Sequence, residues 1–147
     1  MDFSKQKKKL SNKIAEIGHG PLELIEARKE IEGANAALAA QRIEPDSLKK
    51  MEKAIEKMVK ENMNGADGDR EFHLLLAKST GNRVLETITA YLWEQQQHSP
   101  MWIKLIELME EKKLHNVILD DHRTLLDALR RKDSEEAEAI MRNHLNH

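Results

Sequence analysis

The chain has 147 residues, of which 34% are charged and 39% are hydrophobic, as in a soluble globular domain with a core of its own. Its net charge is -2, so the domain as a whole has no electrostatic attraction to nucleic acid. It has no cysteine, which excludes disulfides, thiolate metal sites and a cysteine nucleophile. No apolar run reaches the roughly 20 residues that span a bilayer, and the N-terminus lacks the apolar stretch of a signal peptide. We therefore expect a cytoplasmic protein that makes no membrane contact.

Residues 1–20 differ from the rest of the chain. They are rich in lysine and end in Gly18, His19 and Gly20. The segment is predicted to be a linker or one short amphipathic helix. Its lysines either contact phosphate or, in the simpler interpretation, are solvated. Residues 21–147 are predicted to form one domain.

The remaining sequence has the composition of a helical protein. Aromatic residues make up only 3% of the chain, whereas leucine, isoleucine, alanine and methionine are plentiful. The three prolines each stand where a helix can begin, because proline is tolerated at the first helical position. Short loops favour antiparallel neighbours, so the predicted fold class is all-α, an antiparallel bundle of about six or seven helices. The predicted helices lie near residues 21–41, 45–62, 68–78, 82–97, 101–111, 113–132 and 134–146.

Apolar residues recur every three or four positions in these segments, as on the core-facing side of an amphipathic helix. In the segment 21–41 this spacing predicts one apolar stripe, made of Leu24, Ala27, Ile31, Ala34 and Leu38. The segment 82–97 carries apolar residues on two faces and is therefore a candidate for a dimer interface. These residues are Val84, Leu85, Ile88, Tyr91 and Leu92.

Three histidines fall on apolar faces. His122 continues the apolar series of the segment 113–132, and His144 continues that of the last segment. His73 shares one helical face with Asp69, four residues earlier. An unpaired polar group in a core costs about 1–3 kcal/mol, and one divalent cation would satisfy all four side chains. Imidazole and carboxylate ligands suit Zn²⁺, Ni²⁺, Fe²⁺ or Mn²⁺. The alternative is ordinary core histidines that are hydrogen-bonded to carbonyl or carboxylate groups.

Three segments of the sequence are similar to the FCD domain. They are LIEARKEIEGANAALAA (24–40), DREFHLLLAKSTGNRVL (69–85) and DHRTLLDALRRKDSEEAEAIMRNHL (121–145). The FCD domain is the effector-binding C-terminal domain of FadR-type, GntR-family bacterial transcription regulators. The resemblance runs from about residue 20 to the end of the chain. It implies that an effector bound in the bundle interior controls DNA binding by a partner domain.

The resemblance also implies a metal site. In the metal-binding branch of the family, an Asp-x-x-x-His pair and two later histidines hold one divalent ion, with zinc or nickel expected first and iron or manganese as alternatives. Those positions correspond to Asp69, His73, His122 and His144. The resemblance places the ion at the base of a pocket, where a small carboxylate metabolite completes its coordination. One aspartate and three neutral histidines leave a divalent ion with positive charge, which favours an anion. A six-coordinate ion would keep two positions open, whereas tetrahedral zinc would be saturated and structural.

Two further residues are predicted to contact the effector. Arg28 belongs to the EAR motif of the family's first helix, whose arginine tends to reach the pocket, and a guanidinium can clamp a carboxylate. The residues alone favour a surface pair between Arg28 and Glu32 instead. Asn82 follows Gly81 and either orients a ligand or caps the next helix.

The resemblance has limits. Full-length family members carry an N-terminal winged helix-turn-helix, for which twenty residues leave no room, so the chain is expected to be an isolated effector domain or a standalone version. DNA contact is then expected only through a domain absent from this chain, and a homodimer is expected because such regulators read two-fold DNA sites. We expect no enzyme and no catalytic residue, since HExxH and GxSxG motifs are missing. The alternatives are a structural metal-stapled dimerisation or adaptor domain and, least favoured, a metal-dependent hydrolase.

Overall fold

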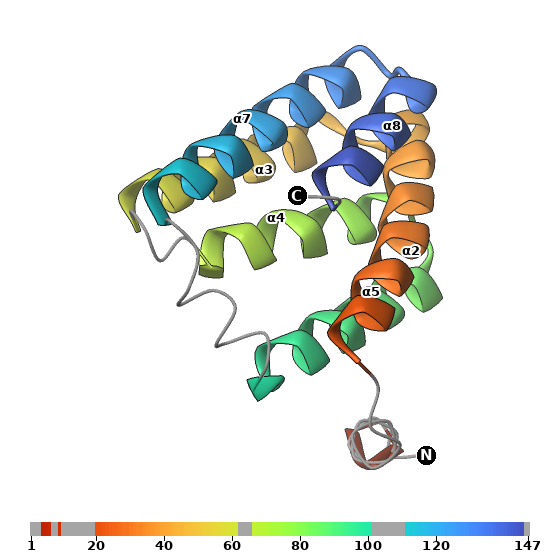
Figure 1. Cartoon of the computed structure of the whole chain (residues 1–147). Coiled ribbons are helices and arrows are strands. Elements are labelled where there is room, and N and C mark those ends of the chain that lie inside the picture. Colours follow the sequence, from red (N-terminus) through yellow and green to blue (C-terminus); the bar gives the residue numbers. More distant parts are fainter. Residues whose placement is uncertain (1–3, 7–8, 10–19, 62–65, 101–110, 146–147) are drawn as a thin grey trace.

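The computed structural model describes residues 4–6, 9, 20–61, 66–100 and 111–145. Within these ranges the chain forms helices and no strand, which confirms the predicted all-α bundle (Figure 1). The predicted helix at 101–111 and most of the segment 1–20 lie outside the described residues. No described helix is long and apolar enough to cross a membrane. The helices are α2 (Pro21–Arg42), α3 (Pro45–Lys60), α4 (Ala66–Ser79), α5 (Arg83–Gln97), α7 (Glu111–Arg130) and α8 (Ser134–His144).

The helix ends follow from local chemistry. Pro21 and Pro45 occupy the first turns of α2 and α3, where the missing N–H of proline has no helical partner to lose. The turn between α4 and α5 contains Gly81 with φ of 71°, a left-handed conformation that glycine adopts without steric cost. Asn82 then caps α5, because its side-chain oxygen accepts hydrogen bonds from the backbone N–H groups of Val84 and Leu85. Asp133 caps α8 in the same way.

Helix α4 lies in the middle of the bundle and packs against α2, α3 and α5 (Figure 1). Helix α7 packs along α3, and α8 returns to pack against both α7 and α2, so that the C-terminal end of α8 comes close to α4 (Figure 1). The core between these helices contains fully buried large side chains, including Met51, Met58, Phe72, Leu76, Leu129 and Met141. The central position of α4 lets residues on one of its faces meet residues from α7 and α8.

The sequence pattern predicts the wrong core-facing side for α2. Of the predicted stripe only Leu24 is buried, whereas Ala34 is exposed and the other three residues are half-buried. The buried side instead carries Arg28, Glu32 and Asn35, together with small residues such as Ala39. Polar side chains can occupy this side because they pair with one another and with α5, so their burial leaves few unsatisfied groups.

Candidate metal centre

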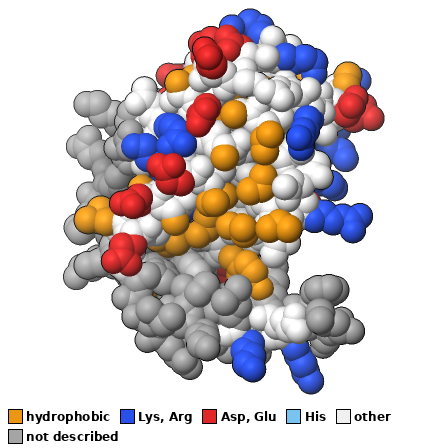
Figure 2. Space-filling view, turned by 90° about the vertical axis from the view of Figure 1, so that its right-hand side faces the viewer, with side chains coloured by type: hydrophobic (Ala, Val, Ile, Leu, Met, Phe, Trp, Pro, Cys, Tyr) orange, Lys and Arg blue, Asp and Glu red, His pale blue; other side chains and the backbone are white. Residues whose placement is uncertain are grey.

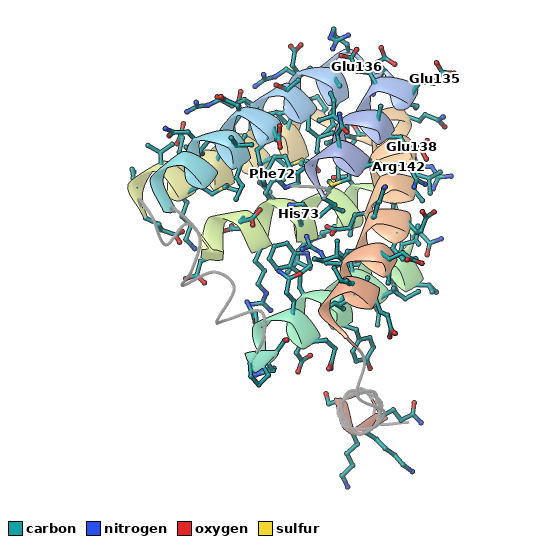
Figure 3. All side chains as sticks on the ribbon, viewed as in Figure 1. Phe72, His73, Glu135, Glu136, Glu138 and Arg142 are labelled. Carbon is teal, nitrogen blue, oxygen red and sulfur yellow. The ribbon has the colours of Figure 1, made fainter. Side chains whose placement is uncertain are left out.

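The four predicted ligands converge at one point between α4, α7 and α8. One ligand atom from each of Asp69, His73, His122 and His144 lies within 4.8 Å of the others. Because Asp69 and His73 are four residues apart, they project from the same face of α4. His122 comes from the middle of α7, and His144 is the last residue of α8. Figure 3 labels His73 on α4, near the centre of the bundle.

The three imidazole rings pack closely and are shielded from water. His73 and His122 are 1% exposed. The ring centres of His122 and His144 are 4.9 Å apart, and His73 lies 5.2 Å from His122 and 5.5 Å from His144. Three imidazoles gathered in so little space, with a carboxylate beside them, form a donor set that prefers a cation.

Each histidine has its Nδ1 turned toward an acceptor outside the cluster. His73 Nδ1 lies 2.6 Å from Glu32 Oε1, His122 Nδ1 lies 2.6 Å from the Ile118 carbonyl oxygen, and His144 Nδ1 lies 2.9 Å from Asp121 Oδ2. A carbonyl or carboxylate oxygen can only accept, so each Nδ1 carries the proton and donates it. The Nε2 atom of a neutral ring then presents a lone pair. This arrangement is the usual one behind metal-ligating histidines.

The carboxylate of Asp69 lies against two imidazole nitrogens. Its Oδ1 lies 2.8 Å from His122 Nε2 and 3.1 Å from His73 Nε2. A carboxylate oxygen and an imidazole lone pair at that distance repel unless a proton or a metal ion lies between them. His73 Nε2, although buried, makes no hydrogen bond of acceptable geometry among the described residues.

A single ion fits this geometry after a small contraction. Ligand atoms at about 2.2 Å from one ion can be no more than about 4.4 Å apart. The largest separation is 4.8 Å, so the side chains need to approach by only a few tenths of an ångström. The donor set and the unsatisfied, buried His73 Nε2 therefore fit a divalent ion held by these four side chains.

A set of buried polar contacts pairs α2 with α5 on one side of the site, and we call it the polar ladder. Arg28 Nη1 donates to Gln96 Oε1 at 2.7 Å, and Asn35 Nδ2 donates to Thr89 Oγ1 at 2.9 Å. Between these two rungs, Trp93 Nε1 lies 3.4 Å from Glu32 Oε1. Arg28 Nε also donates to Glu32 at 2.8 Å, and its guanidinium lies 4.3 Å from the centre of the Trp93 ring. Through Glu32 the ladder is connected to His73.

The charges of this region perturb its ionisation. Burial would raise the pKa of Glu32, but the Arg28 charge and then the His73 charge outweigh burial and hold this pKa at about 2. Burial would lower the pKa of His73, but Glu32 and then Asp69 raise it to about 9. Burial lowers the pKa of His144 more than the hydrogen bond to Asp121 raises it. The pKa of Asp69 is well below its ordinary value, because hydrogen-bonding contact with His122 and His73 outweighs burial. In the absence of a metal, the site thus attracts a proton to His73.

The two predicted effector contacts are placed differently. Arg28 pairs with Glu32 as its spacing predicts, but the pair is buried beside the site rather than on the surface. Asn82 is exposed, and its side-chain oxygen accepts the N–H groups of Val84 and Leu85. It therefore caps α5, while its contact with an effector remains a prediction.

Glu32 is the member of the site that sequence reasoning missed. The sequence alone predicts it as a surface partner of Arg28, whereas it is fully buried. The spacing of Arg28, Glu32 and Asn35 could have indicated its burial, because these three residues lie on one side of the helix. A helix that has an apolar side and a separate polar side can bury the polar one.

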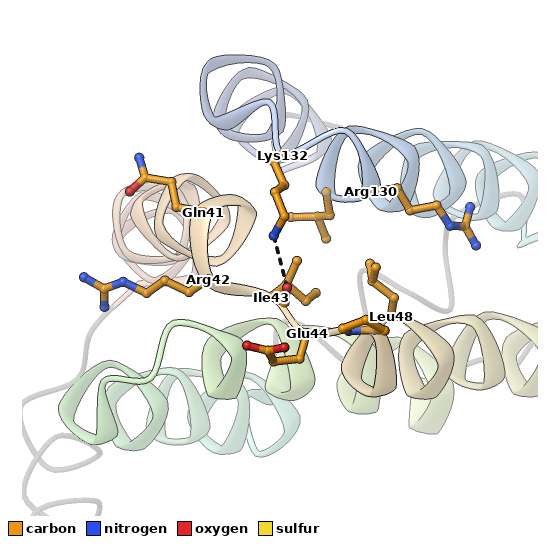
Figure 4. A pocket seen from close by; sticks show the side chains of 9 residues that line it. Gln41, Arg42, Ile43, Glu44, Leu48, Arg130 and Lys132 are labelled. Atoms are coloured by element: carbon orange, nitrogen blue, oxygen red, sulfur yellow. Dashed lines mark hydrogen bonds between the residues drawn. The ribbon is translucent and has the colours of Figure 1, made fainter.

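A separate pocket lies at the other end of α2 and contains none of these residues. It has a volume of about 630 Å³ and is formed where the α2–α3 and α7–α8 turns meet (Figure 4). Lys132 Nζ donates to the Ile43 carbonyl oxygen at 3.3 Å across it (Figure 4). Arg42 is also engaged, because its Nη1 donates to the Thr80 carbonyl oxygen at 2.6 Å. Lys132 and Arg42 thus bind neighbouring turns together.

The described residues thus form an all-helical bundle with an Asp-His-His-His cluster in its interior, and the comparisons with known proteins identify the family of such a domain. The model of the FCD domain family matches residues 23–147. The chain belongs to the FCD domain family, the effector-binding domains of GntR-family transcription regulators.

Its relatives are regulators. The Uxu operon regulator of Haemophilus influenzae is 33% identical over 129 residues, which cover 86% of this chain and 48% of that protein. The Exu regulon transcriptional regulator of Escherichia coli K12 is 33% identical over 136 residues, covering 91% of this chain and 52% of that protein. The chain thus spans about half the length of the curated relatives it matches. They are named as transcription regulators, in agreement with the expectation that the chain is not an enzyme.

Solved structures show the same fold. A GntR protein of Streptococcus agalactiae matches with a TM-score of 0.67 and 26% identity, covering 84% of this chain and 55% of that chain. The E. coli protein McbR/YncC matches with a TM-score of 0.73 and 22% identity, covering 84% of this chain and 59% of that chain, which shows likeness of fold alone.

Proposed function

We propose that this domain senses a small carboxylate metabolite through a divalent metal ion held by Asp69, His73, His122 and His144. The observation that carries the proposal is the orientation of the three imidazoles. Each donates Nδ1–H to an acceptor outside the cluster, so the Nε2 lone pairs are left for one ion. Zinc or nickel is expected first, with iron or manganese as alternatives, because nitrogen and oxygen ligands serve all four.

The effector would bind to the ion. Among the four ligands only Asp69 carries a charge, and Glu32 and Arg28 cancel each other. Asp121, behind His144, is 26% exposed, so water screens its charge and the ion stays positive toward its open coordination positions. An anionic carboxylate that occupies open coordination positions neutralises that charge.

Glu32 and Gln96 engage Nε and Nη1 of Arg28, so its remaining guanidinium N–H groups would contact the effector carboxylate. Asn35 Oδ1, which is buried and has no hydrogen bond among the described residues, is a candidate acceptor for an effector hydroxyl.

The regulatory output belongs to the whole protein. The domain would act as a cytoplasmic homodimer, and DNA would be contacted by a winged helix-turn-helix segment that is not among these residues. Effector binding would then alter how the two copies present those segments to DNA.

Elemental analysis of protein purified without chelators tests the metal. We expect about one equivalent of a divalent metal per chain in the wild type and strongly reduced content in His122→Ala. His98→Ala is the matched control, since His98 is exposed beyond the end of α5. Equal metal content in wild type and His122→Ala would remove His122 from the site.

A thermal-shift panel tests the effector. Lactate, pyruvate, citrate and sugar acids are added to the metal-loaded and metal-free protein. The sensing proposal expects at least one carboxylate to raise the melting temperature only when metal is bound. If metal is bound and no carboxylate has an effect, the alternative of a saturated structural ion is favoured.

A further inference from the structure

The last turn of α8 supplies one side chain of the metal centre and is held from two sides. His144, the last residue of α8, lies toward α4 and α7, and its Nδ1 donates to Asp121 Oδ2 at 2.9 Å. Arg142 lies on the other side of α8, because helical residues two apart point in nearly opposite directions. Figure 3 labels Arg142 and Glu138 on the side of α8 that lies next to α2. His144 and Arg142 therefore contact the bundle from opposite sides of one helical turn.

Arg142 joins α8 to α2 through an ion pair with two hydrogen bonds. Its Nη1 donates to Glu30 Oε1 at 3.0 Å, and its Nη2 donates to Glu30 Oε2 at 3.3 Å. Its Nε donates to Glu138 Oε1 at 3.2 Å, one turn earlier on α8. The planar guanidinium thus binds one carboxylate from each helix, which the single ammonium group of a lysine would not reproduce.

Gly33 makes room for this arginine on α2. Gly33 is buried, and a Cβ at its position would lie 3.0 Å from Arg142 Nε and 3.1 Å from Arg142 Cγ. Both distances are shorter than ordinary contacts between non-bonded heavy atoms. A glycine inside a helix lowers the stability of that helix relative to alanine. The close approach of the Arg142 side chain to the α2 backbone accounts for a glycine here.

We define the α8 clamp as Arg142, Glu30, Glu138 and Gly33, and it acts at the end of α8 that unwinds most easily. The last four carbonyl groups of a helix have no partner within it, so the last turn is lost first. The first turn of α8 is tied to α2 separately, because Ser134 Oγ donates to the Ala37 carbonyl oxygen at 2.9 Å. The clamp is thus the polar contact with α2 nearest to His144 among the described residues.

The clamp lies at the surface, so its effect on overall stability should be small. Figure 2 shows the side of the molecule on which α2 lies, where acidic and basic side chains lie next to one another at the border of a hydrophobic band. Arg142 is 32% exposed and Glu30 is 63% exposed. Exposed ion pairs add little to the stability of a fold. Two hydrogen bonds, a second carboxylate and a glycine that admits the side chain point to a local task.

We propose that Arg142 is a positioning residue of the metal centre, because it holds the last turn of α8 against α2 and so keeps His144 within reach of the ion. This role rests on the proposed function, since His144 must be a ligand. Metal and clamp then stabilise the same helical turn from opposite sides, and loss of either weakens the other. Helix α2 thereby supports the metal centre twice, through Glu32 behind His73 and through Glu30 behind α8.

The affinity of the chain and its variants for Co²⁺ tests the clamp. Co²⁺ is added to chelator-treated protein in competition with a chromophoric chelator. Arg142→Ala removes the clamp, and Gly33→Ala displaces the guanidinium while both charges remain. Each should raise the Co²⁺ dissociation constant at least about threefold. Arg131→Ala is the matched control and should leave this constant unchanged, because Arg131 pairs with Asp127 and Glu136 near the other end of α8.

A double-mutant cycle separates positioning of His144 from a general effect on the fold. In His144→Ala the clamp has no ligand to position, so adding Arg142→Ala should change the Co²⁺ dissociation constant by a factor close to one. The visible spectrum of bound Co²⁺, which depends on its ligands and their geometry, should shift in Arg142→Ala toward that of His144→Ala. An equal loss of affinity from Arg142→Ala in both backgrounds would overturn the inference.

The metal site and the clamp fail in different ways. A wild type that takes up no Co²⁺ refutes the metal site, and the positioning role of Arg142 falls with it. A wild type that binds Co²⁺ no more tightly than Arg142→Ala and Gly33→Ala retains the site and refutes the clamp alone.

Discussion

Replacing Glu32 by glutamine tests whether the site is held in place from α2. Glutamine nearly preserves the shape of Glu32 and keeps one acceptor oxygen, but it removes the charge that faces Arg28 and His73 at 2.8 and 2.6 Å. Removing one partner of a buried ion pair costs about 3–5 kcal/mol. Loss of the carboxylate behind a metal-ligating imidazole weakens metal affinity by about 10–100-fold. We therefore expect both a less stable metal-free protein and a higher metal dissociation constant.

The two effects are measured separately. Urea denaturation of the chelator-treated protein gives the loss in free energy of unfolding. Competition with a chromophoric chelator gives the affinity, for which a 10–100-fold loss corresponds to about 1.4–2.7 kcal/mol. Glu26→Gln, at an exposed position on the same helix, is the control and should change neither quantity. An unchanged dissociation constant in Glu32→Gln would refute the reasoning that Glu32 orients His73, whatever its effect on stability.

Three further predictions concern the frame of the site and its protonation. In Gly68→Ala the new Cβ would lie 2.5 Å from a methionine side chain and 2.8 Å from backbone atoms of α3, so the free energy of unfolding in urea should fall by about 1–3 kcal/mol. In the control Gly33→Ala the new Cβ meets only a flexible arginine side chain at 3.0 Å, so that variant should be nearly neutral. Equal losses in the two variants would contradict this prediction. The raised pKa of His73 stabilises the metal-free fold fully below pH 6.5, and this contribution is lost as the pH rises through about 9. Metal binding releases that proton, so the metal-induced rise in melting temperature should grow from pH 6.5 to 9, and a constant rise would argue against His73 as a ligand. Asn82→Ala removes the cap of α5 and should cost about 0.5–2 kcal/mol without changing metal content, while a lost carboxylate response would support its predicted effector contact.

The convergence of the four ligands could be predicted because each histidine continues an apolar series. An interior position on three helices of one bundle leaves little room for the side chains to point elsewhere, and Asp69 shares a helical face with His73. The resemblance to the FCD domain assigned the same four residues. What the spacing cannot supply is the distance between helices, which depends on features such as the close approach of α4 to α3 at Gly68.

The inner side of α2 could not be predicted in the same way. Apolar periodicity identifies the core only when the core is apolar and the outer surface is polar. On α2 the apolar residues lie outside and a polar ladder lies inside, so the rule selects the wrong side. Glu32 was missed for the same reason, because a glutamate four residues after an arginine is normally a surface partner.

The arrangement of α2 and α5 makes a last prediction, because the two helices support the metal site and α5 also carries the predicted dimer interface. Their inner sides contact His73 through Glu32, and the outer side of α5 carries exposed Val84 and other apolar residues of the predicted interface. If metal binding moves Glu32, it shifts the ladder and with it the outer surface. Equilibrium linkage then requires that metal and dimerisation change each other's affinity by the same factor. Metal titrations at chain concentrations well below and well above the dimer dissociation constant should therefore give metal affinities that differ by about fivefold or more. The ratio should return to one in Val84→Glu, which places a charge in the predicted interface and should weaken the dimer. Equal affinities at both concentrations in the wild type would mean that the ladder is a rigid support and does not transmit metal occupancy to the interface.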